Sequence, residues 1–292
     1  MHFQGTDAVT RIRTVYETPV GTVSRVDRPA PGTSWHEQYL FQRPEDYRPI
    51  EFLIRNQHYE PAYDCFLTAQ RRFGDDVFLR ASIGGYSPLQ EILIRIMGLE
   101  CFSIERAERR DEVLKLYAAL TEQRRKVYPL VAQSPALAVN YGGNINPAVM
   151  GLPRFEQYVL PHYDECAAVL HQRGKLVGVH LDANNRLLAP SIARSRIDYV
   201  EAFTPPPTCD MSVVEARRCW PNKVLWINFP SSVHVAAPAV VAATTRQLLQ
   251  EAAPGDGFLL GITEDVPPDR WQQSFLAISQ VITTTGRYPV VR

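Results

Sequence analysis

A histidine and an aspartate two residues apart are the side chains whose types and spacing best suit chemistry in this sequence. Residues 175–182 read KLVGVHLD, an apolar run that follows Gly174 and ends in a polar turn. Such a run predicts a short buried strand. Side chains at alternate positions of a strand share one face, so the His180 imidazole and the Asp182 carboxylate should project together. The pair could act as acid and base or hold a metal ion.

Both residues also have plain structural interpretations. His180 could be a core histidine bonded to a backbone carbonyl, and Asp182 could cap a helix that begins near Asn185 or Leu187. Parallel α/β sheets collect functional groups where their strands end, at the carboxyl edge. This position favours a functional role for the pair.

Two glutamates are further candidates for catalysis. Glu264 follows a predicted strand and could be a metal ligand or a general acid, although acidic residues at such helix starts also interact with the helix dipole. Glu201 lies inside a predicted strand, where its carboxylate would face a barrel interior or pair with an arginine. We favour the interior, where burial would raise the pKa of Glu201 and let it shuttle protons.

Other strand ends carry polar or aromatic residues that could bind a substrate. For the asparagines, turn formation is an equally good explanation. The candidates are Tyr86, Asn144, Asn146, Asn228 and Phe229.

The elements that must position these residues alternate along the chain. Strand patterns separated by helical ones imply right-handed βαβ units in a parallel sheet, and a barrel is its natural closure. The strands are predicted at residues 76–83, 136–141, 176–180, 198–203, 223–229 and 257–262. An eight-stranded barrel needs two more. We therefore predict an α/β fold, a TIM-barrel-like (β/α) parallel barrel that is incomplete, with about six barrel strands.

The N-terminal region lacks this alternation. Residues 10–16 and 22–27 alternate in hydropathy around a turn, which predicts a β-hairpin. We expect this hairpin and the helices between residues 45 and 73 to cover the open edge of the barrel, in preference to a homodimer. Residues 1–9 resemble a tag remnant or a disordered start, which leaves 10–292 as a single domain.

Composition limits the partners. The 292-residue chain carries 31 Lys plus Arg and 31 Asp plus Glu, so no net field attracts nucleic acid or an anionic membrane. Its five cysteines form no CxxC pair, and no signal peptide or apolar run of membrane length is present. We expect a cytoplasmic enzyme with free thiols that acts on a small molecule.

From Ser82 onward, the strand-end motifs resemble the uroporphyrinogen decarboxylase superfamily in order and spacing. The motifs are GYSPL at 85–89, NINP at 144–147, FEQYVLPHY at 155–163, GVHLD at 178–182, IDYVEAF at 197–203, WINFP at 226–230 and GITEDVPP at 261–268. This superfamily of TIM barrels includes the zinc-dependent corrinoid methyltransferases. The resemblance implies an N-terminally short barrel of the methyltransferase branch.

Two departures from that family bear on function. The N-terminal arginine-rich segment and early aspartate of the decarboxylase have no counterpart here, so porphyrinogen decarboxylation is not expected. The methyltransferases have His-x-Cys and a later Cys where this chain has His180, Asp182 and Glu264. Such a His/Asp/Glu set suits a divalent metal, zinc first, although carboxylates also accept harder cations.

The resemblance thus implies an enzyme whose metal, held by His180, Asp182 and Glu264, activates a small substrate for methyl transfer to or from a corrinoid on a partner protein. Two alternatives stay open. One is a metal-free lyase or decarboxylase of a small carboxylated substrate, with His180 and Asp182 as acid/base pair. The other is a non-catalytic binding subunit that retains the barrel.

Overall fold

The chain divides into two compact units in its computed structural model. The described residues are 2–4, 9–262 and 266–290. The first unit comprises Met1–Tyr63 and Gly85–Ser134, and the second comprises Asp64–Gly84 and Pro135–Arg292. Each unit is described by itself below. The single domain predicted for residues 10–292 stays a prediction.

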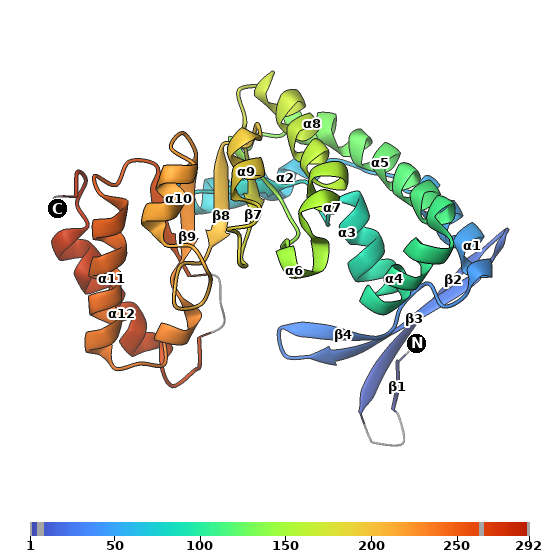
Figure 1. Ribbon diagram of the computed structural model, residues 1–292, viewed down its shortest axis with the longest axis horizontal. Coiled ribbons are helices and arrows are strands. Elements are labelled where there is room, and N and C mark those ends of the chain that lie inside the picture. Colours follow the sequence, from blue (N-terminus) through green and yellow to red (C-terminus); the bar gives the residue numbers. More distant parts are fainter. Residues whose placement is uncertain (1, 5–8, 263–265, 291–292) are drawn as a thin grey trace. The chain divides into compact units, whose positions relative to one another are not determined.

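The second unit is built on a parallel sheet of six strands, whose order in the sheet follows the chain. The strands are β5 (Arg80–Ser82), β6 (Ala138–Tyr141), β7 (Leu176–His180), β8 (Tyr199–Phe203), β9 (Val224–Asn228) and β10 (Phe258–Gly261). Figure 1 shows β7, β8 and β9 side by side. All five pairings between neighbours are parallel. Each strand lies within its predicted range, which confirms the α/β class and the sheet.

Helices separate these strands along the chain. They are α6 (Pro147–Met150), α7 (Leu152–Tyr158), α8 (Leu160–His171), α9 (Ala189–Arg194), α10 (Val213–Cys219), α11 (Pro238–Ala252) and α12 (Trp271–Thr285), with α2 (Tyr63–Phe73) before β5. Alternate strand residues such as Val177, Val179 and Ile227 are completely buried. Burial of each such side chain contributes about 1.5 to 3 kcal/mol, so this apolar layer supplies much of the core energy.

The sheet curls strongly. The Arg80 guanidinium on β5 stacks on the Trp226 ring of β9, 4.6 Å from its centroid, although four strand spacings separate them in the sheet order. Neighbouring strands lie about 4.8 Å apart, so a flat sheet would hold β5 and β9 roughly 19 Å apart. The strands therefore form an arc, as in a barrel wall. Among the described strands no pairing joins β5 to β10, and the predicted covering of this open edge stays a prediction.

Small residues on the inner face of the arc make room for large ones. A Cβ added to Gly178 would lie 1.9 Å from the Tyr199 ring, and one added to Gly261 would lie 2.7 Å from the Trp226 indole nitrogen. A bulge then shifts the register of β8 between Glu201 and Phe203, and Ala202 takes a φ of +60° there. Bulges of this kind re-aim the side chain beside them.

The first unit contains an antiparallel sheet in the order β1-β2-β3-β4. Its strands are β1 (His2–Gln4), β2 (Thr10–Thr18), β3 (Gly21–Ala30) and β4 (Thr33–Gln38). The hairpin of β2 and β3 confirms the predicted one and extends it. Residues 33–38, for which the sequence analysis predicts no strand, pair with β3 as β4. Pro31 and Gly32 form only a tight turn, where Gly32 has a φ of +73°.

Helices complete the first unit. They are α1 (Tyr47–Arg55), α3 (Pro88–Gln90), the π-helix η3 (Glu91–Met97), α4 (Leu99–Glu108) and α5 (Arg110–Ala132). Helix α1 packs against β3 and α5. Throughout the described part of the chain, none of the helices combines the length and apolarity that a membrane span requires.

Candidate functional site

Three of the predicted site residues meet at the carboxyl end of the second unit's sheet. His180 ends β7 and stands opposite Glu201 in the register with β8. Its Nδ1 lies 2.7 Å from Glu201 Oε2, and its Nε2 lies 3.7 Å from Asp182 Oδ2. The parallel register and the alternation of side chains therefore place one imidazole between two carboxylates.

Two residues that the sequence analysis did not select complete this cluster. Arg80 Nη2 donates to Glu201 Oε1 over 2.8 Å, and Asn140 Nδ2 donates to Glu201 Oε2 over 3.3 Å. The Glu201 side chain is only 2% exposed. We considered an interior position or an arginine partner for Glu201, and the structure shows both at once.

The partners of His180 and Glu201 set their protonation. Burial alone would lower the pKa of His180, but Asp182 and Glu201 stabilise the imidazolium and raise its pKa to about 9. Burial alone would raise the pKa of Glu201, but His180 and Arg80 outweigh it and lower that pKa. The expected raised pKa of Glu201 is therefore wrong. Near neutral pH the cluster holds a protonated histidine against an ionised glutamate.

The open side of this cluster is the side of His180 Nε2 and Asp182. The two side chains are 27% and 29% exposed, and their 3.7 Å separation exceeds a hydrogen-bond distance. A ligand atom that accepts a proton can approach Nε2, and a ligand donor can approach the Asp182 carboxylate. Nδ1 is already engaged by Glu201. The arrangement can present one proton at a defined nitrogen.

The backbone of Asp182 is fixed by a side-chain amide. Asn144 Nδ2 donates to the Asp182 carbonyl over 2.9 Å, and the Asp182 amide donates to Asn144 Oδ1 over 3.0 Å. Asp182 does not begin the next helix, because Leu188 is the residue that precedes α9. The capping alternative for Asp182 is therefore wrong, and Asn144 holds the loop that carries this carboxylate.

The other substrate-binding candidates occupy varied surroundings. Asn146 accepts from the Ala148 amide over 3.0 Å and caps α6. Asn228 ends β9 and is fully buried. Phe229 is also fully buried, with its ring centroid 4.9 Å from that of His234. A role for any of them in binding substrate stays a prediction.

Two further predicted site residues are not among the described residues of the second unit. Tyr86 belongs to the first unit, where its carbonyl accepts from Arg124 Nη2 over 2.7 Å. Glu264 lies outside the described residues, so its part in catalysis or metal binding stays a prediction.

The predicted metal site can be compared with the donors present. The contact of Glu201 with Nδ1 is of the kind that orients a metal-binding histidine through its other nitrogen. Tetrahedral zinc needs at least three protein ligands. Among the described residues, no group of three or more His, Cys, Asp or Glu side chains is arranged to hold a metal. His180 and Asp182 alone provide too few ligands for such a zinc ion. A metal site that includes Glu264 stays a prediction.

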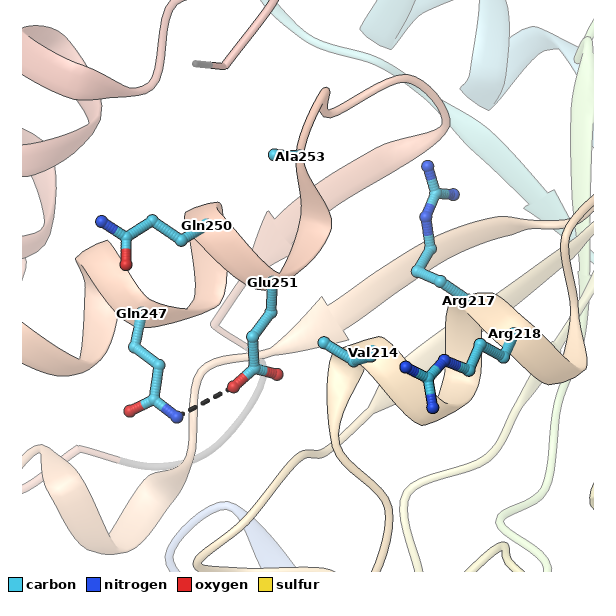
Figure 2. Close-up of a pocket in the computed structure, with 7 residues that line it drawn as sticks. All are labelled: Val214, Arg217, Arg218, Gln247, Gln250, Glu251 and Ala253. Carbon is cyan, nitrogen blue, oxygen red and sulfur yellow. Dashed lines mark hydrogen bonds between the residues drawn. The ribbon is translucent and has the colours of Figure 1, made fainter. Parts of the chain in front are cut away.

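The second unit also has a pocket beside its helices. Figure 2 shows a pocket of about 480 Å³ beside α10 and α11, with Arg217, Arg218 and Glu251 on its wall. The Glu251 carboxylate accepts hydrogen bonds from the Val213 amide over 3.2 Å and from Gln247 Nε2 over 2.8 Å. No residue of the His180 cluster lines this pocket. It offers charged surface without an arranged acid and base.

The contacts of His180 with Glu201 and Asp182 should make the free energy of unfolding depend on pH. The folded pKa of His180, about 9, exceeds its ordinary 6.5, so its contribution is complete below pH 6.5 and is lost as pH rises through 9. Each pKa unit corresponds to about 1.4 kcal/mol, and solvent screening should leave roughly 1 to 2 kcal/mol. Urea unfolding between pH 6 and 9.5 should show this loss in the wild type and not in His180→Gln. If the free energy of unfolding changes equally with pH in the wild type and in His180→Gln, His180 is not the group whose raised pKa stabilises the fold.

Comparison with known proteins gives a fold likeness. No family model matches the chain, and the search of curated proteins finds no match. Among solved structures, a methyltransferase from Methanosarcina mazei superposes with a TM-score of 0.57 at 11% identity, covering 85% of this chain and 72% of that one. At this identity the likeness establishes the fold alone. Membership of the uroporphyrinogen decarboxylase superfamily stays a prediction.

Proposed function

We propose that this chain is a methyl-transferring enzyme in which His180 donates a proton to the atom that loses the methyl group. One observation carries the proposal: a partly exposed imidazole is held between two carboxylates, with Nδ1 engaged and Nε2 open. The fold likeness to a methyltransferase supports the same reading. The site lies where parallel α/β folds place catalytic groups.

The proposed step is a displacement on the methyl carbon. The bond between that carbon and an oxygen, nitrogen or sulfur of the substrate breaks, and its electron pair stays on the heteroatom. The Nε2 proton of His180 then passes to this heteroatom, so that a neutral group departs. A corrinoid on a partner protein would supply the nucleophile that takes the methyl group. Neutral His180 afterwards regains its proton from solvent.

The neighbouring residues support this proton transfer. Glu201 accepts from Nδ1, which keeps the transferable proton on Nε2. Arg80 keeps Glu201 ionised, and Asn144 positions Asp182 beside Nε2. No step requires a metal ion held by this chain. The predicted zinc site on His180, Asp182 and Glu264 is a separate proposal, which metal analysis of the purified protein decides.

The test supplies free cob(I)alamin as methyl acceptor and a panel of ¹³C-methyl ethers, amines and thioethers as donors. Protein-dependent loss of the cob(I)alamin absorbance, with ¹³C-methylcobalamin detected by NMR, is the expected result. The activity should survive a chelator. Transfer that stops on chelation and returns with zinc would overturn the metal-free step.

The same preparation separates the alternatives. A metal-free decarboxylase would release ¹³CO₂ from ¹³C-carboxyl substrates without moving any methyl group. A binding subunit would bind a donor without turnover. Either result, with no methyl transferred from the panel, would overturn the proposal.

A further inference from the structure

We infer that the first unit carries a second ligand site, a pocket for a small apolar molecule with a cationic head group. The pocket has a volume of about 570 Å³ and lies between the loop after β4 and the start of α4. Pockets of 300 to 1,000 Å³ with mostly apolar walls are typical of small-molecule sites. All of its wall belongs to the first unit, so the inference is independent of the function proposed for His180.

The pocket has an apolar floor and an apolar rim. Phe41 and Met97 form the floor and are 3% and 2% exposed. Leu99 and Ile104 on α4 also line the pocket and are 51% and 47% exposed. An alkyl or aryl-alkyl group in the pocket would remove this surface from water at about 25 cal/mol per Å².

An uncommon backbone shapes the wall. The π-helix η3 spans seven residues and ends at Met97, and the next residue, Gly98, has a φ of +75°. A Cβ at Gly98 would lie 2.5 Å from the Tyr39 ring, so only glycine lets this ring lie on the backbone. π-Helical turns are rare and occur frequently at functional sites. The position of this π-helix beside a pocket fits a binding role.

The charges of the wall select the head group. Glu100 and Glu105 line the pocket, and no lysine or arginine does. Glu105 is buried and satisfied by Tyr47 at 2.9 Å and Arg109 at 2.8 Å. Glu100 is exposed at the rim and makes no ion pair among the described residues. An ammonium at the rim would meet Glu100 in water, while a carboxylate there would be repelled.

The chain contains a built-in probe for occupancy. Cys101 lines the pocket and is partly exposed, whereas Cys65 and Cys219 are exposed and do not line it. Burial and the nearby glutamates raise the pKa of the Cys101 thiol, so alkylation is best followed near pH 8.5. A ligand in the pocket should protect Cys101 from iodoacetamide and leave the other two thiols reactive.

The experiment compares n-octylamine, octanol and octanoate by calorimetry and by site-resolved alkylation of the full chain. Octylamine should bind roughly threefold to tenfold more tightly than octanoate, as expected for one partly exposed charge pair in place of a repulsion. Octylamine should also protect Cys101 selectively. Absence of saturable octylamine binding, equal binding of octanoate, or equal protection of all three cysteines would overturn the inference.

A cation added at the rim gives a second, independent test. Ile104→Arg changes an exposed side chain and places a positive charge beside Glu100, so it should abolish the preference and let octanoate bind about as tightly as octylamine. Ile282→Arg is the matched control, because Ile282 is also an exposed helical isoleucine, at 37%, and lies in the second unit. An unchanged preference in Ile104→Arg would overturn the assignment of the pocket.

Discussion

Replacement of His180 by glutamine should lower the rate of methyl transfer by roughly 10²- to 10⁴-fold, the usual contribution of a positioned proton donor. The glutamine amide can still donate to Glu201, so the buried carboxylate keeps a partner and the fold is retained. The glutamine side chain cannot supply a proton to the departing atom. Steady-state kinetics with the best donor of the panel should therefore show the loss in kcat, with little change in KM.

The pH profile distinguishes a proton donor from a residue that only shapes the site. Wild-type activity should fall as pH rises through about 9, because His180 loses its proton there. The residual activity of His180→Gln should lack this limb. His58→Gln is the matched control, since the His58 side chain is 83% exposed. If His180→Gln keeps both the wild-type rate and the wild-type limb, His180 is not the donor.

Local sequence patterns were sufficient to predict the second unit's strands. Most of the six are apolar runs bounded by glycine or polar residues, and each of the six lies within its predicted range. The strand ending at His180 was predicted to the residue. The spacing of two residues at one strand end is why His180 and Asp182 could be assigned to one site from sequence, and the shared carboxyl edge of parallel strands is why that end could be assigned a function.

Long-range pairing could not be predicted in the same way. Arg80 and Glu201 are 121 residues apart in the chain, and alternation shows which face a side chain occupies without naming its partner across the arc. The error over the Glu201 pKa has the same origin. Burial was visible in the sequence, but the two cations that lower this pKa were not.

Strand β4 and the pocket beside α4 illustrate two further limits. Most β4 residues are polar and exposed, so their hydrophobic pattern is weak, and their pairing with β3 is a tertiary effect. The pocket depends on a π-helix and on the contact of Tyr39 with Gly98, which no local pattern encodes. Sites made by backbone irregularity are therefore harder to predict than sites at strand ends.

Replacement of Glu201 by leucine should destabilise the second unit by about 3 to 5 kcal/mol, because it leaves Arg80 and His180 without their shared counter-charge. Urea unfolding at pH 7 can be followed by tryptophan fluorescence, since Trp226 contacts Arg80 directly. The matched control is Glu156→Leu, whose side chain is 42% exposed and pairs with Arg194. Its expected cost is within about 1 kcal/mol.

The double variant Arg80→Met with Glu201→Leu decides whether charge imbalance or lost packing causes that cost. Removing both partners of a buried ion pair is often close to neutral, whereas removing one leaves an uncompensated charge. The double variant should therefore recover at least about 1 to 2 kcal/mol relative to Glu201→Leu, which is the coupling expected for residues in direct contact. His180 keeps Asp182 within 3.7 Å in both backgrounds and so contributes equally to each. In one contrary result, the double variant costs as much as the Arg80→Met and Glu201→Leu single variants added together, and in another, Glu201→Leu costs no more than Glu156→Leu. Either result would show that the buried charge cluster does not hold this end of the sheet together.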